Sequence, residues 1–248
     1  MTSAAPILGC SPLCCRRSIN SAALPTASMI PFETASGSPA TEITHRLCAA
    51  SISVSSKATP GTPVRAAARA MERLFGPNGA CGGCWCMCWR TETYAAWCKI
   101  KGDGAKKAFM NLVQKGKAKG VLAFAQNEPI GWCSFGPRTD FPVLQRSKAY
   151  ARDDVSDIWS ITCFFIHHGW RRRGLARKLL KAAVEIMQKR GVKTIEAYPV
   201  TTTKEGRKLG SSLAWTGPLK IYEELGFKTV QSINPLRPLV RLESKKET

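Results

Sequence analysis

The sequence predicts an α/β fold, in which a central sheet of mixed parallel and antiparallel strands is flanked by helices on both faces. Two strand-like segments, 121–125 and 130–134, are joined by a short polar connection that ends in Pro129, which predicts an antiparallel hairpin. Further along, strand-like residues 158–166 and 193–200 enclose a helix-like segment. That order implies a parallel crossover, so both kinds of pairing are expected in one sheet.

Helices are expected where apolar residues recur every three or four positions. The sequence favours helices over residues 64–75, 105–114, 175–190 and 220–225. Thr62 and Pro63, a typical N-cap and first helical residue, come before the first of them. Glycines that end a helix follow three of them, at Gly76, Gly191 and Gly226.

The remaining segments are short strands and polar loops. Strands are predicted at 52–54, 227–232 and 239–242, where apolar residues alternate or cluster. Residues 138–156 are polar and are expected to be rich in loops, and residues 201–213 are expected to form a polar loop.

The composition is that of a globular, strongly basic protein. Of the 248 residues, 44% are hydrophobic, which excludes collagen, a coiled coil and a fully disordered chain. A net charge of +20 favours an anionic partner, such as nucleic acid, an anionic membrane surface or a phosphorylated small molecule. The basic residues lie within foldable segments and therefore form a charged domain surface rather than a tail. No apolar run approaches the about 18 residues that a membrane-spanning helix needs.

The first 48 residues differ from the rest. Residues 1–48 are rich in serine, threonine, alanine and proline, so we expect a disordered tail or a targeting segment. Arg16, Arg17 and Arg46 among many hydroxyl residues resemble an organellar transit peptide. One folded domain is expected over residues 49–244. The expected compartment is the cytoplasm, or a mitochondrion or chloroplast if the segment is a transit peptide.

Successive arginines lie where the crossover helix begins. Arg171, Arg172 and Arg173 precede Gly174, and the positive end of the helix dipole disfavours each exposed cation there by roughly 0.3–1 kcal/mol. A bound polyanion removes this conflict, because the free backbone N–H groups of a first helical turn bind phosphate oxygens. Arginine side chains add paired contacts. A solvated basic loop is the alternative interpretation, and the segment lacks the P-loop and dinucleotide-binding patterns.

Three segments together resemble the GNAT superfamily of N-acetyltransferases. The sequence RRRGLA at 171–176, after a strand, is similar to the family's coenzyme A motif, [Q/R]-x-x-G-x-[G/A]. The sequence YEELGF at 222–227 is similar to its second motif, Y-x-x-x-G-F, and EAYPV at 196–200 falls where its fifth strand is expected. GGCWCM at 82–87 and AWTG at 214–217 resemble one bacterial-type subgroup.

The resemblance implies transfer of an acetyl group from acetyl-CoA, a co-substrate, to a primary amine by direct attack on the thioester. It implies that the backbone around Phe165 and Ile166 pairs with the pantetheine arm and polarises the thioester carbonyl. It places Tyr222 where many relatives have the acid that protonates the departing thiolate. It assigns the pyrophosphate to the turn residues Arg171, Arg172, Arg173, Gly174, Leu175, Ala176 and Arg177.

A general base is also needed, since an amine of pKa about 10.4 is mostly protonated at neutral pH and cannot attack. We name Glu196 with Tyr222 as the candidate catalytic residues. His167, His168 and Asp157 are alternatives for the base. Each of these four side chains is also compatible with an ordinary surface or hydrogen-bonded polar role.

A run of cysteines lies between the first two predicted helices. Cys81 and Cys84 begin like a zinc knuckle, but no second Cys-x-x-Cys follows, so no metal is expected. Cys84, Cys86 and Cys88 alternate as in a strand, which predicts one face of thiols. Reduced, buried thiols are the expected state, with a redox or substrate-facing thiol as an alternative.

Two other functions compete with acetyl transfer. The basic surface suggests a nucleic-acid-binding module, although the sequence lacks the motifs of such folds. The missing base leaves open a GNAT-fold protein that binds acyl-CoA without catalysis. A membrane partner is not expected, and the acceptor amine and the oligomeric state are not defined by the sequence.

Overall fold

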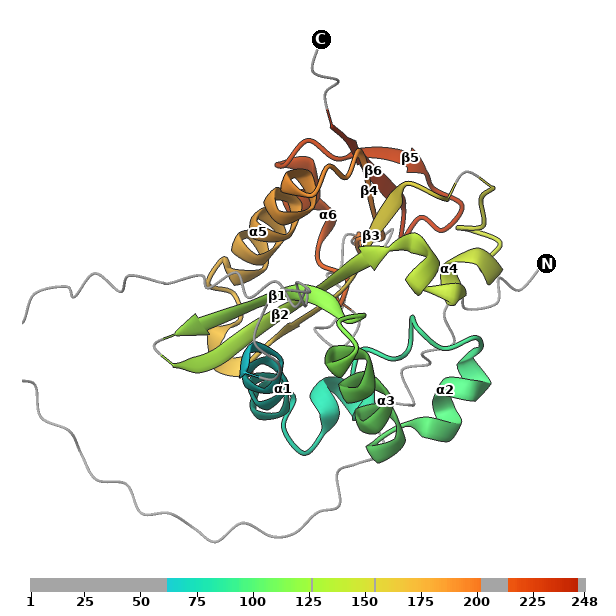
Figure 1. Ribbon diagram of the computed structural model, residues 1–248. Helices are drawn as coiled ribbons and strands as arrows, with labels where there is room; N and C mark the ends of the chain where they lie inside the picture. The colour runs from blue at the N-terminus through green and yellow to red at the C-terminus, as the bar shows by residue number, and fades with distance from the viewer. Residues whose placement is uncertain (1–61, 126, 154, 202–213, 245–248) are drawn as a thin grey trace, which may run out of the picture.

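A six-stranded mixed sheet forms the centre of the protein (Figure 1). The structure is a computed structural model that describes residues 62–125, 127–153, 155–201 and 214–244. Its strands are β1 (Lys119–Ala125), β2 (Glu128–Pro137), β3 (Ile158–Ile166), β4 (Thr194–Ala197), β5 (Lys228–Gln231) and β6 (Leu239–Glu243). Their order across the sheet is β1-β2-β3-β4-β6-β5, with β3 and β4 parallel and the other neighbouring pairs antiparallel. The predicted mixed sheet is confirmed.

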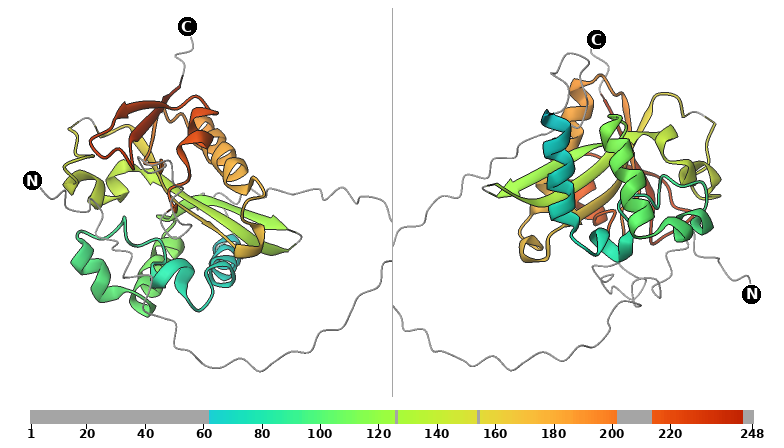
Figure 2. Two further views of the ribbon diagram at one scale, coloured as in Figure 1. Left: turned by 180° about the vertical axis from the view of Figure 1, so that it is seen from behind. Right: turned by 60° about the horizontal axis from the view of Figure 1, so that its bottom comes forward.

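Helices cover both faces of this sheet, as predicted. Helix α1 (Thr62–Phe75) and helix α3 (Asp103–Gln114) lie on one face, and helix α5 (Leu175–Lys189) lies on the other (Figures 1 and 2). Helix α6 (Leu219–Glu223) packs beside α5. Among the described residues, no helix is long and apolar enough to cross a membrane.

The predicted elements agree with the structure most closely in the crossover. Strand β3 has the predicted bounds, and α5 ends one residue before the predicted end. Strands β1 and β2 are longer than predicted, and β4 is shorter. Helix α1 includes Thr62, which was predicted as the cap outside the helix. The predicted strand at 52–54, residues 1–48 and residues 202–213 of the predicted loop lie outside the described residues.

One prediction about local structure is wrong, and two short helices were not predicted. The helices are α2 (Tyr94–Ile100) and α4 (Pro142–Arg146), the second of which lies within a segment expected to be rich in loops. The cysteine segment is a series of turns and not a strand, with Trp85 and Cys86 at φ of 47° and 55°. Both of these neighbours are buried, whereas strand alternation places them on opposite faces.

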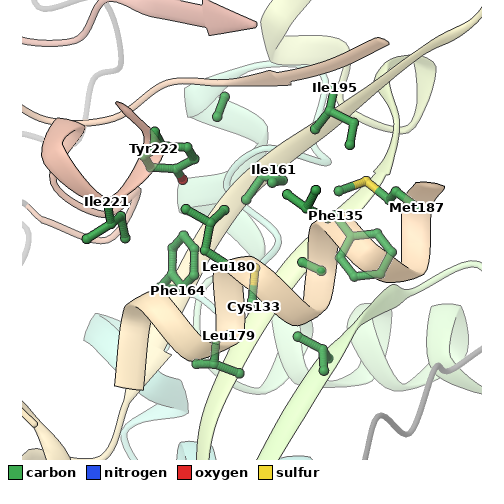
Figure 3. Close-up of a cluster of buried hydrophobic side chains, with 14 of the residues drawn as sticks. Cys133, Phe135, Ile161, Phe164, Leu179, Leu180, Met187, Ile195, Ile221 and Tyr222 are labelled. Carbon is green, nitrogen blue, oxygen red and sulfur yellow. The ribbon is translucent and has the colours of Figure 1, made fainter. Parts of the chain in front are cut away.

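The hydrophobic core lies on both sides of the sheet. Between the sheet and α5, Leu179, Leu180 and Met187 pack against Phe135 and Ile161 (Figure 3). Burying side chains of this size contributes about 1.5–3 kcal/mol each. On the other face, residues of α1 and α3 pack with Trp85, Cys86 and Met87 of the cysteine segment.

One feature of the sheet determines where a ligand can bind. Strand β4 pairs with β3 only between Ile158 and Ile161, and it ends at Ala197. Residues 162–166 of β3 therefore extend past β4, and the peptide groups on that side have no β4 partner. An unpaired strand edge is a ready acceptor for an extended ligand.

Candidate functional site

The turn between β3 and α5 presents backbone N–H groups to solvent. Residues 171–174 are exposed, and α5 begins at Leu175. Gly174 has a left-handed backbone with φ of 75°, and Arg172 is left-handed at φ of 59° although it has a side chain. Turns that place left-handed residues next to a helix start make concave anion-binding sites. Because a non-glycine residue is strained there, the turn is a candidate functional segment.

The arginine side chains of this turn make different contacts. The Nε of Arg171 donates a hydrogen bond to the carbonyl of Ile166 at 3.0 Å, and the Arg173 guanidinium lies 5.3 Å from the centre of the Trp170 ring. Arg177 forms a paired contact with the carboxylate of Glu224, at 2.5 and 2.9 Å. This ion pair links α5 to the turn after α6. It raises the pKa of Arg177 and lowers that of Glu224.

The open edge of β3 is formed by alternate residues. Peptide groups of successive strand residues point to opposite sides. The N–H of His167 donates to the β2 carbonyl of Ile130, so His167 and Phe165 face β2, while Phe164 and Ile166 face the open side. Of the predicted pair Phe165 and Ile166, only Ile166 turns its peptide group to the open side. Phe164, which the sequence motifs did not indicate, also faces this side.

A turn at residues 214–217 already contacts this edge. The Phe164 N–H donates to the carbonyl of Trp215 at 2.5 Å. The turn is closed by a hydrogen bond from the Gly217 N–H to the Ala214 carbonyl at 3.0 Å. Gly217 has φ of 78°, and an added Cβ would lie 3.4 Å from Phe164 and from its other nearest neighbours. Glycine thus supplies the left-handed turn at close range to the strand.

Tyr222 lies beside the same strand edge. Its side chain is fully buried, with its ring 6.5 Å from that of Phe164 (Figure 3). The hydroxyl donates a hydrogen bond to the carbonyl of Thr216 at 2.8 Å. Burial, followed by the nearby Cys133 and Cys163 thiols, raises the pKa of Tyr222 well above its ordinary value. The phenol is consequently protonated throughout the neutral range.

Glu196 lies in a different, fully buried environment. Its Oε2 is 3.1 Å from the Nη1 of Arg138, and its Oε1 is 2.7 Å from the Nη2 of Arg241. The hydroxyl of Tyr198 also donates to Oε2 at 3.2 Å. Both carboxylate oxygens are therefore engaged. A general base needs an accessible oxygen, so this arrangement favours a structural role for Glu196.

The other candidate bases do not come together with Tyr222. His167 and His168 are exposed at the end of β3, with ring centres 4.2 Å apart, and Asp157 is exposed before β3. These three side chains are exposed, whereas Tyr222 is fully buried, so the geometry singles out no base.

The cysteine segment places thiols on the α1 face of the sheet. The thiol of Cys84 accepts a hydrogen bond from that of Cys88 and further ones from the backbone at Cys86, Met87 and Cys88, and these bonds lower its pKa despite burial. Cys163 on β3 has a raised pKa, because its thiol hydrogen-bonds to Cys86 and is buried. Within the described ranges, no group of histidine, cysteine or acidic residues is arranged to hold a metal ion.

The sequence matches the acetyltransferase (GNAT) family over residues 78–210, which is more than half of the chain. The chain therefore belongs to this family. It is accordingly an acyl-CoA-dependent N-acetyltransferase, and acetyl-CoA is its co-substrate. A search of curated proteins returned no match.

Solved structures with similar folds are distant in sequence. A protein from Desulfovibrio desulfuricans, assigned to the GNAT family of acetyltransferases, is 15% identical, with 71% of this chain and 92% of that chain covered and a TM-score of 0.42. The PaiA N-acetyltransferase from Thermoplasma acidophilum, in complex with coenzyme A, is 12% identical, with 73% and 92% covered and a TM-score of 0.40. PH1933 from Pyrococcus horikoshii is 14% identical, with 76% and 96% covered and a TM-score of 0.41. The family assignment rests on the sequence match.

Proposed function

We propose that the turn at 171–177 binds the pyrophosphate of acetyl-CoA. Support comes from the exposed turn with two left-handed residues, Arg172 and Gly174, at the start of a fifteen-residue helix. The backbone N–H groups there and the positive end of the helix dipole both favour a phosphate group. The cluster of arginines supplies further charge. This assignment also explains part of the net charge of +20.

The pantetheine arm then runs along the open edge of β3. The peptide groups of Phe164 and Ile166 face that side, and an extended ligand pairs with such an edge as an added strand does. In this proposal the Phe164 N–H donates to the thioester carbonyl. A donor aimed at the oxygen that becomes negative lowers the barrier to attack. The single observation that carries the proposal is this edge of β3, which β4 leaves uncovered and which runs directly into the arginine turn.

Tyr222 acts on the leaving group. The nitrogen of a neutral amine attacks the acetyl carbonyl carbon, and the carbon–sulfur bond breaks. The amine nitrogen loses a proton to water, while the sulfur takes one from the Tyr222 hydroxyl, which water then reprotonates. The Tyr222 hydroxyl donates a hydrogen bond to the departing sulfur, and its raised pKa keeps the proton on oxygen until that moment. Its hydroxyl now donates to the Thr216 carbonyl, so it must turn from this partner to reach the sulfur.

The acceptor is a primary amine that approaches from the side of the cysteine segment. Trp89 at the end of this segment stacks on Tyr198 after β4, with ring centres 5.5 Å apart. Phe141 and Tyr150 from the segment between β2 and β3 join the same cluster. The cysteine segment and the segment between β2 and β3 therefore meet beyond the end of β4, and the proposal places the entry of the acceptor beside them. The domain bounds of 49–244 and a cytoplasmic or organellar compartment remain predictions.

Thermal unfolding and thiol release test the proposal together. Acetyl-CoA at 100 times its Kd stabilises a folded protein by about 2.7 kcal/mol, which is a shift of several degrees. We expect this shift with acetyl-CoA and with coenzyme A, but not with acetyl-pantetheine, which lacks the pyrophosphate. A panel of amines should then release free thiol from acetyl-CoA. Equal shifts with acetyl-CoA and acetyl-pantetheine would overturn the pyrophosphate assignment, and no shift with acetyl-CoA would overturn binding itself.

A further inference from the structure

Two groups of the proposed site are engaged by one turn. The carbonyl of Trp215 accepts from the Phe164 N–H, and the carbonyl of the next residue, Thr216, accepts from the Tyr222 hydroxyl. The turn therefore fixes the thioester donor and the leaving-group acid at the same time. Whatever holds this turn also sets the geometry of the site.

Arg237 holds the turn through both of these residues. It lies in the connection between β5 and β6, and its Nη1 donates to the Thr216 hydroxyl at 2.7 Å. Its guanidinium carbon lies 4.1 Å from the centre of the Trp215 ring, which is a close cation–π contact. Thr216 is fully buried. A planar guanidinium serves both contacts, because it stacks on the ring while its edge donates a hydrogen bond.

The backbone of Arg237 is fixed as well. Its carbonyl accepts a hydrogen bond from the hydroxyl of Tyr150, a fully buried tyrosine, at 2.9 Å. Two residues earlier in the chain, the carbonyl of Pro235 accepts from the Thr201 hydroxyl at 2.8 Å. The backbone on both sides of the Arg237 side chain is therefore held by hydrogen bonds. We call the contacts of this side chain with Trp215 and Thr216 the clamp.

We propose that Arg237 is a positioning residue for acetyl transfer: by clamping the turn at 214–217, it sets the Phe164 amide and the Tyr222 hydroxyl. The proposal rests on the proposed function for its catalytic part. A single N–H donates well to one acceptor, so the thioester carbonyl has to replace the Trp215 carbonyl at Phe164. At Phe164 the thioester carbonyl thus takes the place of the Trp215 carbonyl, which requires the turn at 214–217 to shift. Arg237 limits the distance over which the turn moves.

Amide exchange at Phe164 tests the clamp without any turnover. Protein labelled with ¹⁵N-phenylalanine reports the exchange of this N–H with solvent. Arg237→Gln removes a hydrogen bond to Thr216 and a cation–π contact with Trp215. We therefore expect the Phe164 N–H to exchange about tenfold faster or more. Arg237→Lys keeps a donor for Thr216 and should give an intermediate rate. Arg190→Gln is the control, since Arg190 lies over Trp159 at the other end of β3.

Kinetics of the same variants test the catalytic part. In Arg237→Gln the turn no longer limits how far the Phe164 amide and the Tyr222 hydroxyl move, so both groups are less well oriented and kcat should fall about tenfold. The KM for acetyl-CoA should fall or stay level, because the Phe164 N–H leaves the Trp215 carbonyl more easily. A merely structural role predicts a loss of folded protein with the kcat and KM of the folded fraction unchanged. If Arg237→Gln does not fold, Thr216→Val removes the same hydrogen bond and should speed exchange at Phe164.

The outcomes separate the two proposals. If the amide exchange rate at Phe164 is unchanged in Arg237→Gln, Arg237 does not hold the turn, whatever the activity of the variant. The same conclusion follows from Thr216→Val where that variant is used instead. Faster exchange with unchanged kcat overturns the catalytic part of the inference. A wild-type protein that neither binds nor turns over acetyl-CoA overturns the proposed function, while the exchange rates still decide whether Arg237 holds the turn.

Discussion

Gly174 and Gly191 stand near opposite ends of α5 in almost the same left-handed backbone, with φ of 75° and 76°. A Cβ added at either position meets no atom within 4 Å. Neither position therefore needs a glycine to avoid a steric clash. Both need it for a left-handed backbone conformation, which residues with a Cβ disfavour. The two positions therefore have the same local cost of substitution, but only Gly174 lies in the turn proposed to bind pyrophosphate.

Gly174→Ala and Gly191→Ala should consequently differ in binding and not in stability. Left-handed alanine costs about 1–2 kcal/mol, so each variant should lose a few degrees in Tm. Gly174→Ala should weaken acetyl-CoA binding about tenfold or more, because relief of the strain moves the N–H groups of the turn. Calorimetric titration measures both Kd values. Equal affinities for the two variants would show that the turn does not hold the co-substrate.

Tyr222→Phe should lower kcat by about 10²-fold, since general acid catalysis contributes 10²–10⁴-fold. The pKa of Tyr222 is raised, so its phenol stays protonated at and above neutral pH and donates over the whole range in which the amine becomes neutral. Wild-type kcat should thus rise with pH as the acceptor deprotonates, without an alkaline fall below about pH 10, the ordinary pKa of tyrosine.

The matched variant for Tyr222→Phe is Tyr198→Phe, which also removes a fully buried hydroxyl. Tyr198 accepts from Arg138 at 2.7 Å, so its loss should reduce stability with little effect on kcat. An equal fall in kcat in both variants would contradict the acid role of Tyr222.

Glu196→Gln should destabilise the protein strongly. The carboxylate lies between Arg138 and Arg241, and breaking a buried ion pair costs about 3–5 kcal/mol because it leaves uncompensated charge. Glu224→Gln, which breaks the exposed contact with Arg177, should leave the Tm almost unchanged. Thermal unfolding measures both. A Glu196→Gln protein with normal Tm and lost kcat would reverse this assignment and restore Glu196 as the base.

The sequence determined the fold and the turn better than it determined the catalytic residues. The strand-like residues 158–166 located β3 to the residue, and RRRGLA located the start of α5, because both signals are local. The roles of Phe164 and Glu196 depend on contacts with residues far along the chain. Whether a peptide group faces β2 or the open edge follows from strand register. The cysteine segment does not alternate as expected, because Trp85 and Cys86 have left-handed backbone conformations. Neither residue is a glycine, so the sequence did not indicate this conformation.

Cys84 should react with iodoacetamide before the other described cysteines. Its pKa is lowered by hydrogen bonds from the Cys88 thiol and the backbone, whereas burial raises the pKa of Cys133. A lowered pKa increases the thiolate fraction at any pH below the ordinary value, and the thiolate is the nucleophile. At pH 7 the difference should be largest, and it should shrink as the pH rises and other thiols ionise. Mass spectrometry of partly labelled protein measures it, with Cys98, an exposed thiol, as the internal comparison. Faster labelling of Cys98 at pH 7 would show that burial outweighs the hydrogen bonds at Cys84.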